Sequence, residues 1–256
     1  MIEWNVDVLL SLLKQIAASR SGPPSKSRAD FVAQSTSKTG ETVLDEVRDI
    51  IALPKFDAKS AEKQEDVESI EIDEKVFAQL NSYVSTIALM YKDNPFHNFE
   101  HASHVTMSVV KLLSRIVGPS DIICDDKGNV HASTLHDHTY GITSDPLTQF
   151  ACVFSALIHD VDHQGVPNTQ LVAEKQDIAA LYEGRSVAEQ NSVDLAWELL
   201  MSDDYSDLRA AIYGNKCEKG RFRQLVVNSV MATDIMDKEL KNDRNDRWSK
   251  AFTEHS

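Results

Sequence analysis

Apolar residues recur at helical spacing along most of this chain, whereas the alternating pattern of a half-buried strand is absent. Residues 1–18 form the first such segment, and its apolar side chains predict an amphipathic helix that packs on the domain or on a partner. Glu3, Asp7 and Lys14 interrupt the apolar run well before it reaches the length of a membrane span. Contact with a membrane surface and a cleaved signal are the less favoured alternatives.

Two polar stretches separate this segment from the rest of the chain. Residues 19–40 are rich in Ser, Lys, Thr and Pro, a composition that cannot offset its ordering entropy, and they predict a flexible linker. Residues 41–71 are expected to hold a short helix, Glu41 to Ala52, and then an acidic linker, because Pro54 ends the helical pattern. The folded body is therefore expected to span residues 72–256.

The helical pattern of this body predicts an all-α, multi-helix fold. Ser144-Asp145-Pro146 has the cap and first-turn proline of a helix start, and the helix that follows is apolar on nearly every side, as expected at the centre of a core. Residues 120–143 read as a polar loop. The helices expected in the body are Val76–Tyr91, Asn98–Val117, Pro146 to about His163, Val187–Met201 and Phe222–Leu240.

The net charge limits the kinds of partner that are expected, and the cysteine content limits the expected cellular compartment. With 26 Lys and Arg against 40 Asp and Glu, the formal net charge is -14, which disfavours nucleic acid and anionic membranes. Any phosphate ligand must therefore be held by local cations. The 3 cysteines are widely spaced and form no C-x-x-C pattern, so they favour a reducing compartment such as the cytoplasm over a disulfide framework or a thiolate zinc site.

Two short segments carry candidate chemistry, residues 97–102 and residues 159–165. His97 and His101 are four residues apart and would share one helical face if one helix included both, and His159 and His163 repeat that spacing beside Asp160. One such histidine pair arises by chance fairly often, and a single buried histidine is usually a core residue. A His-Asp pair at the end of an apolar helix is harder to explain in this way, because burying these groups without partners costs several kcal/mol.

Imidazole and carboxylate are ligands that suit zinc and other divalent ions. The order of residues here resembles the class I cyclic nucleotide phosphodiesterases, whose pattern H-N-x-x-H-A followed by H-D-x-x-H-x-G-x-x-N is matched by residues 97–102 and 159–168. The resemblance extends from about Val76 to the end of the chain, and it implies the all-α fold of the His-Asp metal phosphohydrolases.

The resemblance also implies roles for individual residues. His101, His159 and Asp160 look like ligands of the tighter metal, usually Zn²⁺, and Asp160 like the bridge to a second ion, usually Mg²⁺ or Mn²⁺. His97 resembles the proton donor, held by a carboxylate such as Glu189. The remaining residues resemble supports of this centre: His163, Glu189 and Thr233 as residues that orient water or the proton donor, and Asn168 as a structural partner.

The implied reaction is metal-dependent hydrolysis of cyclic AMP or cyclic GMP to the nucleoside 5′-monophosphate in cytoplasmic signalling. It needs a nucleophile at neutral pH and stabilised phosphoryl oxygens, which two metals supply, and a proton for the departing oxygen, which His97 supplies. The cytosolic face of a membrane is the expected location if a longer polypeptide is anchored there. Regulatory domains and self-association in such a polypeptide are left open.

The chain also departs from the family pattern. Where the family often has Glu-Asn-His-His, this chain has Glu189-Gln190-Asn191-Ser192, and no role is assigned to the last two. His131, His136 and His138 are expected in a solvated loop rather than at a metal. The family's further metal-binding Asp, its purine-binding Gln and its aromatic clamp would lie beyond Ser256, so we expect the catalytic domain to be incomplete and the chain alone to bind zinc weakly and to turn over slowly.

Two other functions remain open at this point. Other His-Asp metal phosphohydrolases share the metal ligands, although the H-N-x-x-H-A segment disfavours them. A non-catalytic module would bind a metal or a nucleotide without turnover.

Overall fold

All regular elements in the described part of the chain are helical, as the apolar spacing predicts. The computed structural model describes residues 1–20, 42–48, 50–56, 69–116 and 132–253. Within these ranges the helices are α1 (Ile2–Arg20), α3 (Val43–Glu46), α5 (Glu74–Met90), α6 (Phe99–Leu113), α7 (Ala132–His138), α8 (Pro146–Ile158), α9 (Asn168–Ala173), α10 (Asp177–Leu181), α11 (Val187–Met201), the 3₁₀ turn η2 (Asp203–Tyr205), α12 (Ser206–Ile212), α13 (Lys216–Met231) and α14 (Lys238–Thr253).

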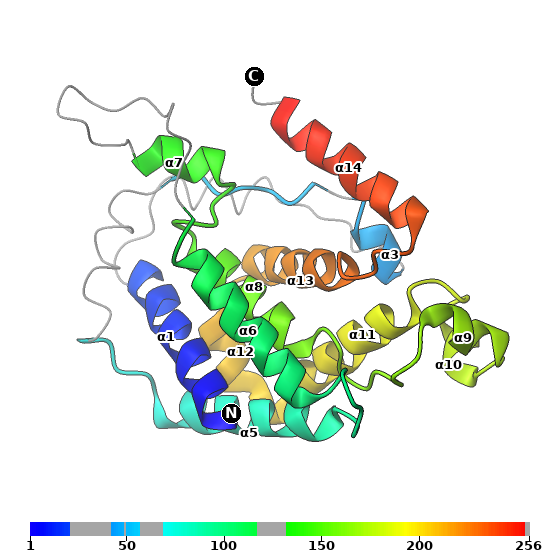
Figure 1. Ribbon diagram of the computed structural model, residues 1–256. Coiled ribbons are helices and arrows are strands. Elements are labelled where there is room, and N and C mark those ends of the chain that lie inside the picture. Colours follow the sequence, from blue (N-terminus) through cyan, green and yellow to red (C-terminus); the bar gives the residue numbers. More distant parts are fainter. Residues whose placement is uncertain (21–41, 49, 57–68, 117–131, 254–256) are drawn as a thin grey trace.

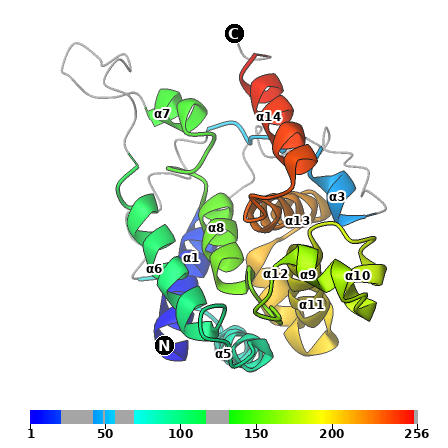
Figure 2. The same ribbon diagram turned by 45° about the vertical axis from the view of Figure 1, so that its right-hand side comes forward.

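Helix α8 lies at the centre of the core. Its start follows the predicted signal, because Asp145 caps it by accepting a hydrogen bond from the Thr148 N–H at 3.2 Å and Pro146 occupies its first turn. Only Gln149 and Cys152 of its 13 residues are not buried. Helices α1, α6 and α13 pack around it, and Figures 1 and 2 show them on different sides of it. A helix enclosed in this way needs apolar side chains on nearly every face.

Helix α1 is part of the same core. Its apolar face, which includes Leu9, Leu13 and Ile16, is buried against α5 and α8. The amide of Asn5 donates to the Ser103 hydroxyl of α6 at 3.0 Å, and the guanidinium of Arg20 donates to carbonyl groups at the end of α12. The folded body thus includes α1 as well as the residues after Ile72.

Several predicted helices end at different residues in the structure, and α6, expected to run to Val117, ends at Leu113. Helix α8 stops at Ile158 rather than near His163, because the Val161 N–H bonds to the Ile158 carbonyl three residues back and Asp162 then adopts a left-handed backbone with φ 60°. The single helix expected at Phe222–Leu240 is two helices, α13 and α14, because Asp234 accepts hydrogen bonds from the Met236 and Asp237 N–H groups and so starts a turn. The helix expected at Glu41–Ala52 is confined to α3.

The polar segment before α8 also differs from the prediction. Part of the expected loop is helix α7, and His136 is 3% exposed rather than solvated. Its Nε2–H donates to the Pro54 carbonyl at 2.6 Å, and its Nδ1 lies 2.6 Å from the Ser144 hydroxyl. Both ring nitrogens therefore have protein partners, and His136 is a structural residue. His131 lies outside the described residues, as do most of the two predicted linkers.

No helix in the described ranges is both long enough and apolar enough to cross a membrane.

Candidate metal centre

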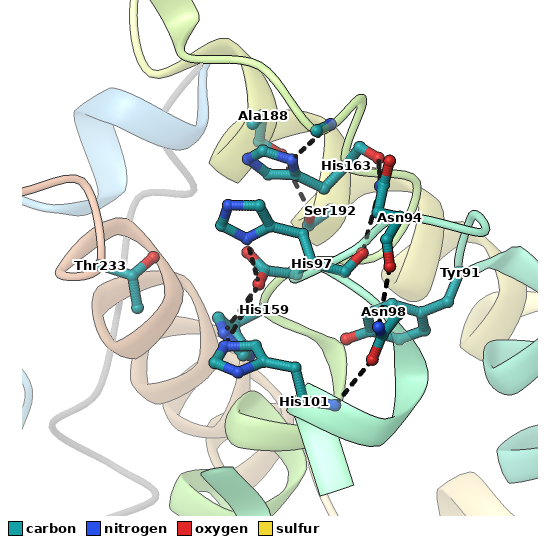
Figure 3. A network of polar contacts seen from close by, with 12 residues as sticks. Tyr91, Asn94, His97, Asn98, His101, His159, His163, Ala188, Ser192 and Thr233 are labelled. Carbon is teal, nitrogen blue, oxygen red and sulfur yellow. Dashed lines mark hydrogen bonds and ion pairs between the residues drawn. The ribbon is translucent and has the colours of Figure 1, made fainter. Parts of the chain in front are cut away.

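Three imidazoles converge on one carboxylate just after the end of α8 (Figure 3). The Asp160 Oδ2 atom lies 2.9 Å from His97 Nδ1, 3.2 Å from His159 Nε2 and 3.7 Å from His101 Nε2. Asp160 and His159 are each 8% exposed. The sequence analysis named all four residues, and the structure brings them together.

The N-terminus of α6 supplies two of the histidines. Asn98 caps this helix by accepting a hydrogen bond from the His101 N–H at 2.9 Å, and its own amide donates to the Asn94 carbonyl at 2.8 Å. The helix therefore begins at Phe99, so His101 lies in its first turn and His97 precedes it. No helix includes both residues, so His97 and His101 do not share a helical face, although both rings reach the same carboxylate.

The turn at residues 159–165 supplies the rest of the cluster. Because α8 has already ended, His159 and His163 do not share a helical face either, contrary to the prediction. The left-handed Asp162 reverses the chain instead, and the ring of His163 stacks on that of His97 with 3.8 Å between centroids. We call residues 159–165 the metal-binding turn.

The carboxylate and the imidazoles perturb one another. Burial alone would raise the pKa of Asp160, but the neighbouring His159 and His97 outweigh it and hold that pKa far below its usual value. Burial would lower the pKa of His159, but the hydrogen bond and charge of Asp160 raise it above 6.5. Burial and the neighbouring His159 lower the pKa of His101, and burial with His97 lowers that of His163. Asp160 is therefore ionised at neutral pH and can attract a cation.

The donor set fits a divalent transition ion. The Nδ1–H of His159 donates to the Ala156 carbonyl at 2.9 Å, which leaves Nε2 as the atom that faces Asp160 and His101. A second-sphere carbonyl bonded to the far ring nitrogen is typical of histidines that bind metal. One atom from each of His101, His159 and Asp160 lies within 4.8 Å of the other two, and the same holds for His97, Asp160 and His163. Asp160 belongs to both groups and is thus placed to be shared.

The predicted supporting residues form a second polar group beside the cluster. The amide of Asn168 donates to Glu189 Oε2 at 2.9 Å and to Asp234 Oδ2 at 3.4 Å, and its oxygen accepts from the Ala188 N–H at 2.9 Å. Burial, opposed by the Asn168 amide and assisted by Asp234, raises the pKa of Glu189. Asn168 therefore joins the start of α9 to the start of α11 and to the turn after α13.

The carboxylate that holds His97 differs from the predicted one. The carboxylate that binds His97 is Asp160, whereas Glu189 bonds to Asn168. The Thr233 hydroxyl donates to the Val230 carbonyl at 2.6 Å, and Figure 3 shows this residue at the end of its helix, apart from the imidazoles.

Asn94 and Phe96 also belong to the site, although the sequence analysis gave them no role there. The Asn94 amide donates to the His97 carbonyl at 3.2 Å and to the His163 carbonyl at 2.7 Å, so it links the two histidine segments. Phe96 is exposed, and its ring centroid lies 4.3 Å from that of His101. In the sequence, Asp93-Asn94-Pro95 indicates only a turn. Nothing in it shows that the Asn94 side chain also links the two histidine segments.

A cavity of about 340 Å³ opens beside His159 between α6, α8 and α13. Its walls are mainly apolar side chains from α6 and α8, among them Val105, Val109 and Ala156, and Thr233 lies at its α13 end. The cluster therefore borders an open space rather than being enclosed.

Comparison with known proteins agrees with this geometry. Residues 96–247 match the family described as 3′5′-cyclic nucleotide phosphodiesterase, which covers more than half of the chain and includes every residue of the cluster. Two similar human proteins are the dual specificity calcium/calmodulin-dependent 3′,5′-cyclic nucleotide phosphodiesterase 1C, 32% identical over 61% of this chain, and the cGMP-inhibited 3′,5′-cyclic phosphodiesterase 3A, 30% identical over 60%. The chain spans only 19% and 15% of the length of these two relatives.

A solved structure shows the same fold. The phosphodiesterase domain of the RhoPDE fusion protein from the choanoflagellate Salpingoeca rosetta aligns with a TM-score of 0.52 at 20% sequence identity, over 88% of this chain and 66% of that one. The family is metal-dependent, and the described residues contain a His-Asp cluster able to bind a metal. Three findings agree, namely the matched family, the paired histidine segments and the shared fold. This chain therefore belongs to the 3′5′-cyclic nucleotide phosphodiesterase family.

Proposed function

We propose that this protein hydrolyses a 3′,5′-cyclic nucleotide to the nucleoside 5′-monophosphate, in cyclic nucleotide signalling. The observation that carries the proposal is the Asp160 carboxylate, which lies within 3.7 Å of a nitrogen of each of His97, His101 and His159 inside the matched region. The names of similar proteins include a dual specificity enzyme and a probable cyclic-AMP phosphodiesterase from Caenorhabditis elegans. The substrate proposed for this chain is accordingly the class of cyclic nucleotides.

In this proposal His101, His159 and Asp160 hold the tighter divalent ion, Zn²⁺, since two imidazoles and a carboxylate suit that metal. Asp160 also faces the second ion, Mg²⁺ or Mn²⁺, because a carboxylate is the harder ligand of the set. When bound, such a pair of ions supplies a nucleophile at neutral pH and stabilises charge on the phosphoryl oxygens. The chain's own residues then have to position the substrate and move a proton.

His97 is the proposed proton donor. Its Nδ1–H donates to Asp160 at 2.9 Å, which fixes the ring, and its side chain is 33% exposed, so a substrate can approach it. A positioned imidazolium can protonate the departing 3′ oxygen of the ribose, which is the task of a general acid. The ring of His163, stacked at 3.8 Å, restricts the rotation of His97.

The remaining predicted residues support this arrangement. Asn168 and Glu189 connect the start of α11 to the start of α9, and we propose that Glu189 and Thr233 orient water near the ions rather than bind the ions themselves. With a formal net charge of -14, the molecule offers an anionic substrate no long-range attraction, so the local cations and the His97 ring are the groups expected to hold the phosphate. The wide spacing of the 3 cysteines supports action in the cytoplasm, which cell fractionation would check.

The test is product analysis with both cyclic nucleotides. The protein, supplied with Zn²⁺ and Mg²⁺ or Mn²⁺, is incubated with cyclic AMP or cyclic GMP, and 5′- and 3′-monophosphates are separated by chromatography. Formation of the 5′-monophosphate that disappears on chelation and in His97→Ala supports the proposal. Stoichiometric metal with no hydrolysis by the protein would instead indicate a binding module, and hydrolysis of other phosphate esters alone would indicate a different His-Asp phosphohydrolase.

A further inference from the structure

Asn191 and Ser192, which stand where the family's Glu-Asn-His-His often has its two histidines, both contact the metal-binding turn. The Asn191 amide donates to Asp162 Oδ2 at 3.1 Å, and the Ser192 hydroxyl lies 2.8 Å from the Val161 carbonyl. Both residues are buried, at 8% and 0% exposure. Figure 3 shows Ser192 on α11 beside the histidine rings. We infer that Asn191 and Ser192 are positioning residues that hold the metal-binding turn in the conformation its ligands require; the inference rests on the proposed metal centre.

The turn needs such support because its backbone is unusual. Asp162 has φ 60°, a left-handed conformation that residues other than glycine rarely adopt, although Asp tolerates it better than most. This reversal lets Asp160 face His97 while His163 stacks on the same ring. If Asp162 relaxed to a right-handed conformation, the chain after it would take another direction and His163 would leave the ring of His97.

Asn191 is the partner best placed to fix the Asp162 side chain. Lys92 Nζ lies 3.0 Å from the other carboxylate oxygen, but that side chain is 42% exposed, and exposed ion pairs are screened and weak. Asn191 is 8% exposed, so water competes less for its hydrogen bond than for the ion pair of Lys92. The Ser192 hydroxyl bonds to the backbone carbonyl of Val161, the residue before Asp162. Two neighbouring residues of α11 therefore hold two neighbouring residues of the turn.

Removing the Asn191 amide should not unfold the protein. The Asp162 side chain is 30% exposed and keeps Lys92 as a partner, so its charge remains paired and in contact with water. The expected effect is instead a looser turn. Loss of a residue that hydrogen-bonds a metal ligand typically lowers metal affinity about 10- to 100-fold. Asn191 bonds to Asp162 beside the ligands rather than to a ligand, so about tenfold, the lower end of that range, is expected for Asn191→Ala.

The chain offers a matched control on the same helix. Gln190 is also a buried amide, 4% exposed, but its side chain donates to the Arg185 carbonyl at 2.7 Å. Gln190→Ala should therefore cost similar stability without loosening the turn. Asn191→His, the residue that the family often has at this position, keeps an N–H donor and should restore most of the affinity.

Two readouts separate this inference from the proposed function. Hydrogen exchange of the metal-free protein is measured at the backbone amides of residues 161–163, which donate to the Ile158, Met90 and Asp160 carbonyls. Co²⁺ affinity and its visible spectrum are measured in parallel at a temperature where every variant is folded. In Asn191→Ala and Ser192→Ala, exchange at these three amides should rise about fivefold to tenfold and Co²⁺ affinity should fall, with neither change in Gln190→Ala.

The outcomes lead to different conclusions. Unchanged exchange in the turn of Asn191→Ala and Ser192→Ala overturns the positioning role, whatever the Co²⁺ affinity does. Faster exchange in the turn with undiminished Co²⁺ affinity also overturns it, because these residues would then stabilise the fold alone. A parent protein that binds no Co²⁺ contradicts the proposed metal centre, and with it any role of Asn191 in positioning ligands.

Discussion

Asp160→Asn is the substitution that tests the metal centre most directly. The side chain keeps its shape, so no cavity forms, but the only carboxylate within reach of His97, His101 and His159 in the described cluster loses its charge. Zinc sites with four protein ligands bind with about 10 to 16 kcal/mol, or roughly 2.5 to 4 kcal/mol for each ligand. Loss of the carboxylate should therefore weaken Zn²⁺ binding about 10² to 10³-fold.

The same substitution should change the titration of His159 in the metal-free protein. Burial lowers the pKa of this ring and Asp160 raises it, so without the charge the pKa should fall from above 6.5 to below 6.5. Zn²⁺ affinity is measured by competition with a coloured chelator, and the titration is followed by the His159 ring signals in NMR spectra.

Asp194→Asn serves as the matched control, since this aspartate bonds to Tyr182 and lies outside both candidate ligand groups. Zn²⁺ affinity in Asp160→Asn equal to that of the parent would refute the assignment of Asp160 as a ligand. A change of equal size in Asp194→Asn would show that the effect comes from stability rather than coordination.

Three further predictions concern single histidines. His97→Ala should keep Zn²⁺ affinity but slow hydrolysis by about 10² to 10⁴, and less on an activated nitrophenyl phosphodiester whose leaving group needs no proton; loss of metal together with activity would make His97 a ligand instead. Zn²⁺ affinity should rise with pH through and above 6.5, by up to about tenfold per pH unit. The reason is that His159, whose pKa is raised, holds a proton below that pKa, and the ion must displace it. Equal dissociation constants at pH 6 and pH 8 would contradict this prediction. His136→Ala should lower the free energy of unfolding by about 1 to 3 kcal/mol, since it leaves Pro54 and Ser144 without their partner, while Zn²⁺ affinity stays unchanged in the same titration.

Helix existence could be predicted from the sequence more reliably than helix ends. Val187–Met201 was predicted with both ends as found, because its apolar pattern begins and stops sharply. The end of α8 was not predicted correctly, because apolar residues continue through Val161 and nothing in the sequence shows that Asp162 adopts a left-handed backbone conformation. The break between α13 and α14 depends on hydrogen bonds from Asp234 to the following amides, and a helical pattern of apolar residues runs across it.

The candidate site could be predicted as a set of residues but not as a geometry. The order of His and Asp in two segments identified His97, His101, His159 and Asp160, but neither histidine pair lies within one helix, so neither shares a helical face. The cluster is formed by the ends of two helices that meet, and such a meeting depends on contacts between distant segments, such as the Asn94 amide with the His163 carbonyl. For His136 the sequence analysis expected a solvated side chain, whereas the structure buries it. A histidine in a polar stretch can be buried when a distant carbonyl, here that of Pro54, accepts its hydrogen bond.

The place of α1 in the core has a consequence for how the protein is made. Its partner α8 begins at Pro146, about 126 residues after α1 ends at Arg20. At a synthesis rate of roughly 5 to 20 residues per second, the part of the α1 apolar face that packs on α8 waits about 6 to 25 seconds on the ribosome before that helix exists. Helix α5 can cover its share of α1 earlier, but the surface reserved for α8 stays open in that interval and is a natural target for the chaperones that bind nascent chains.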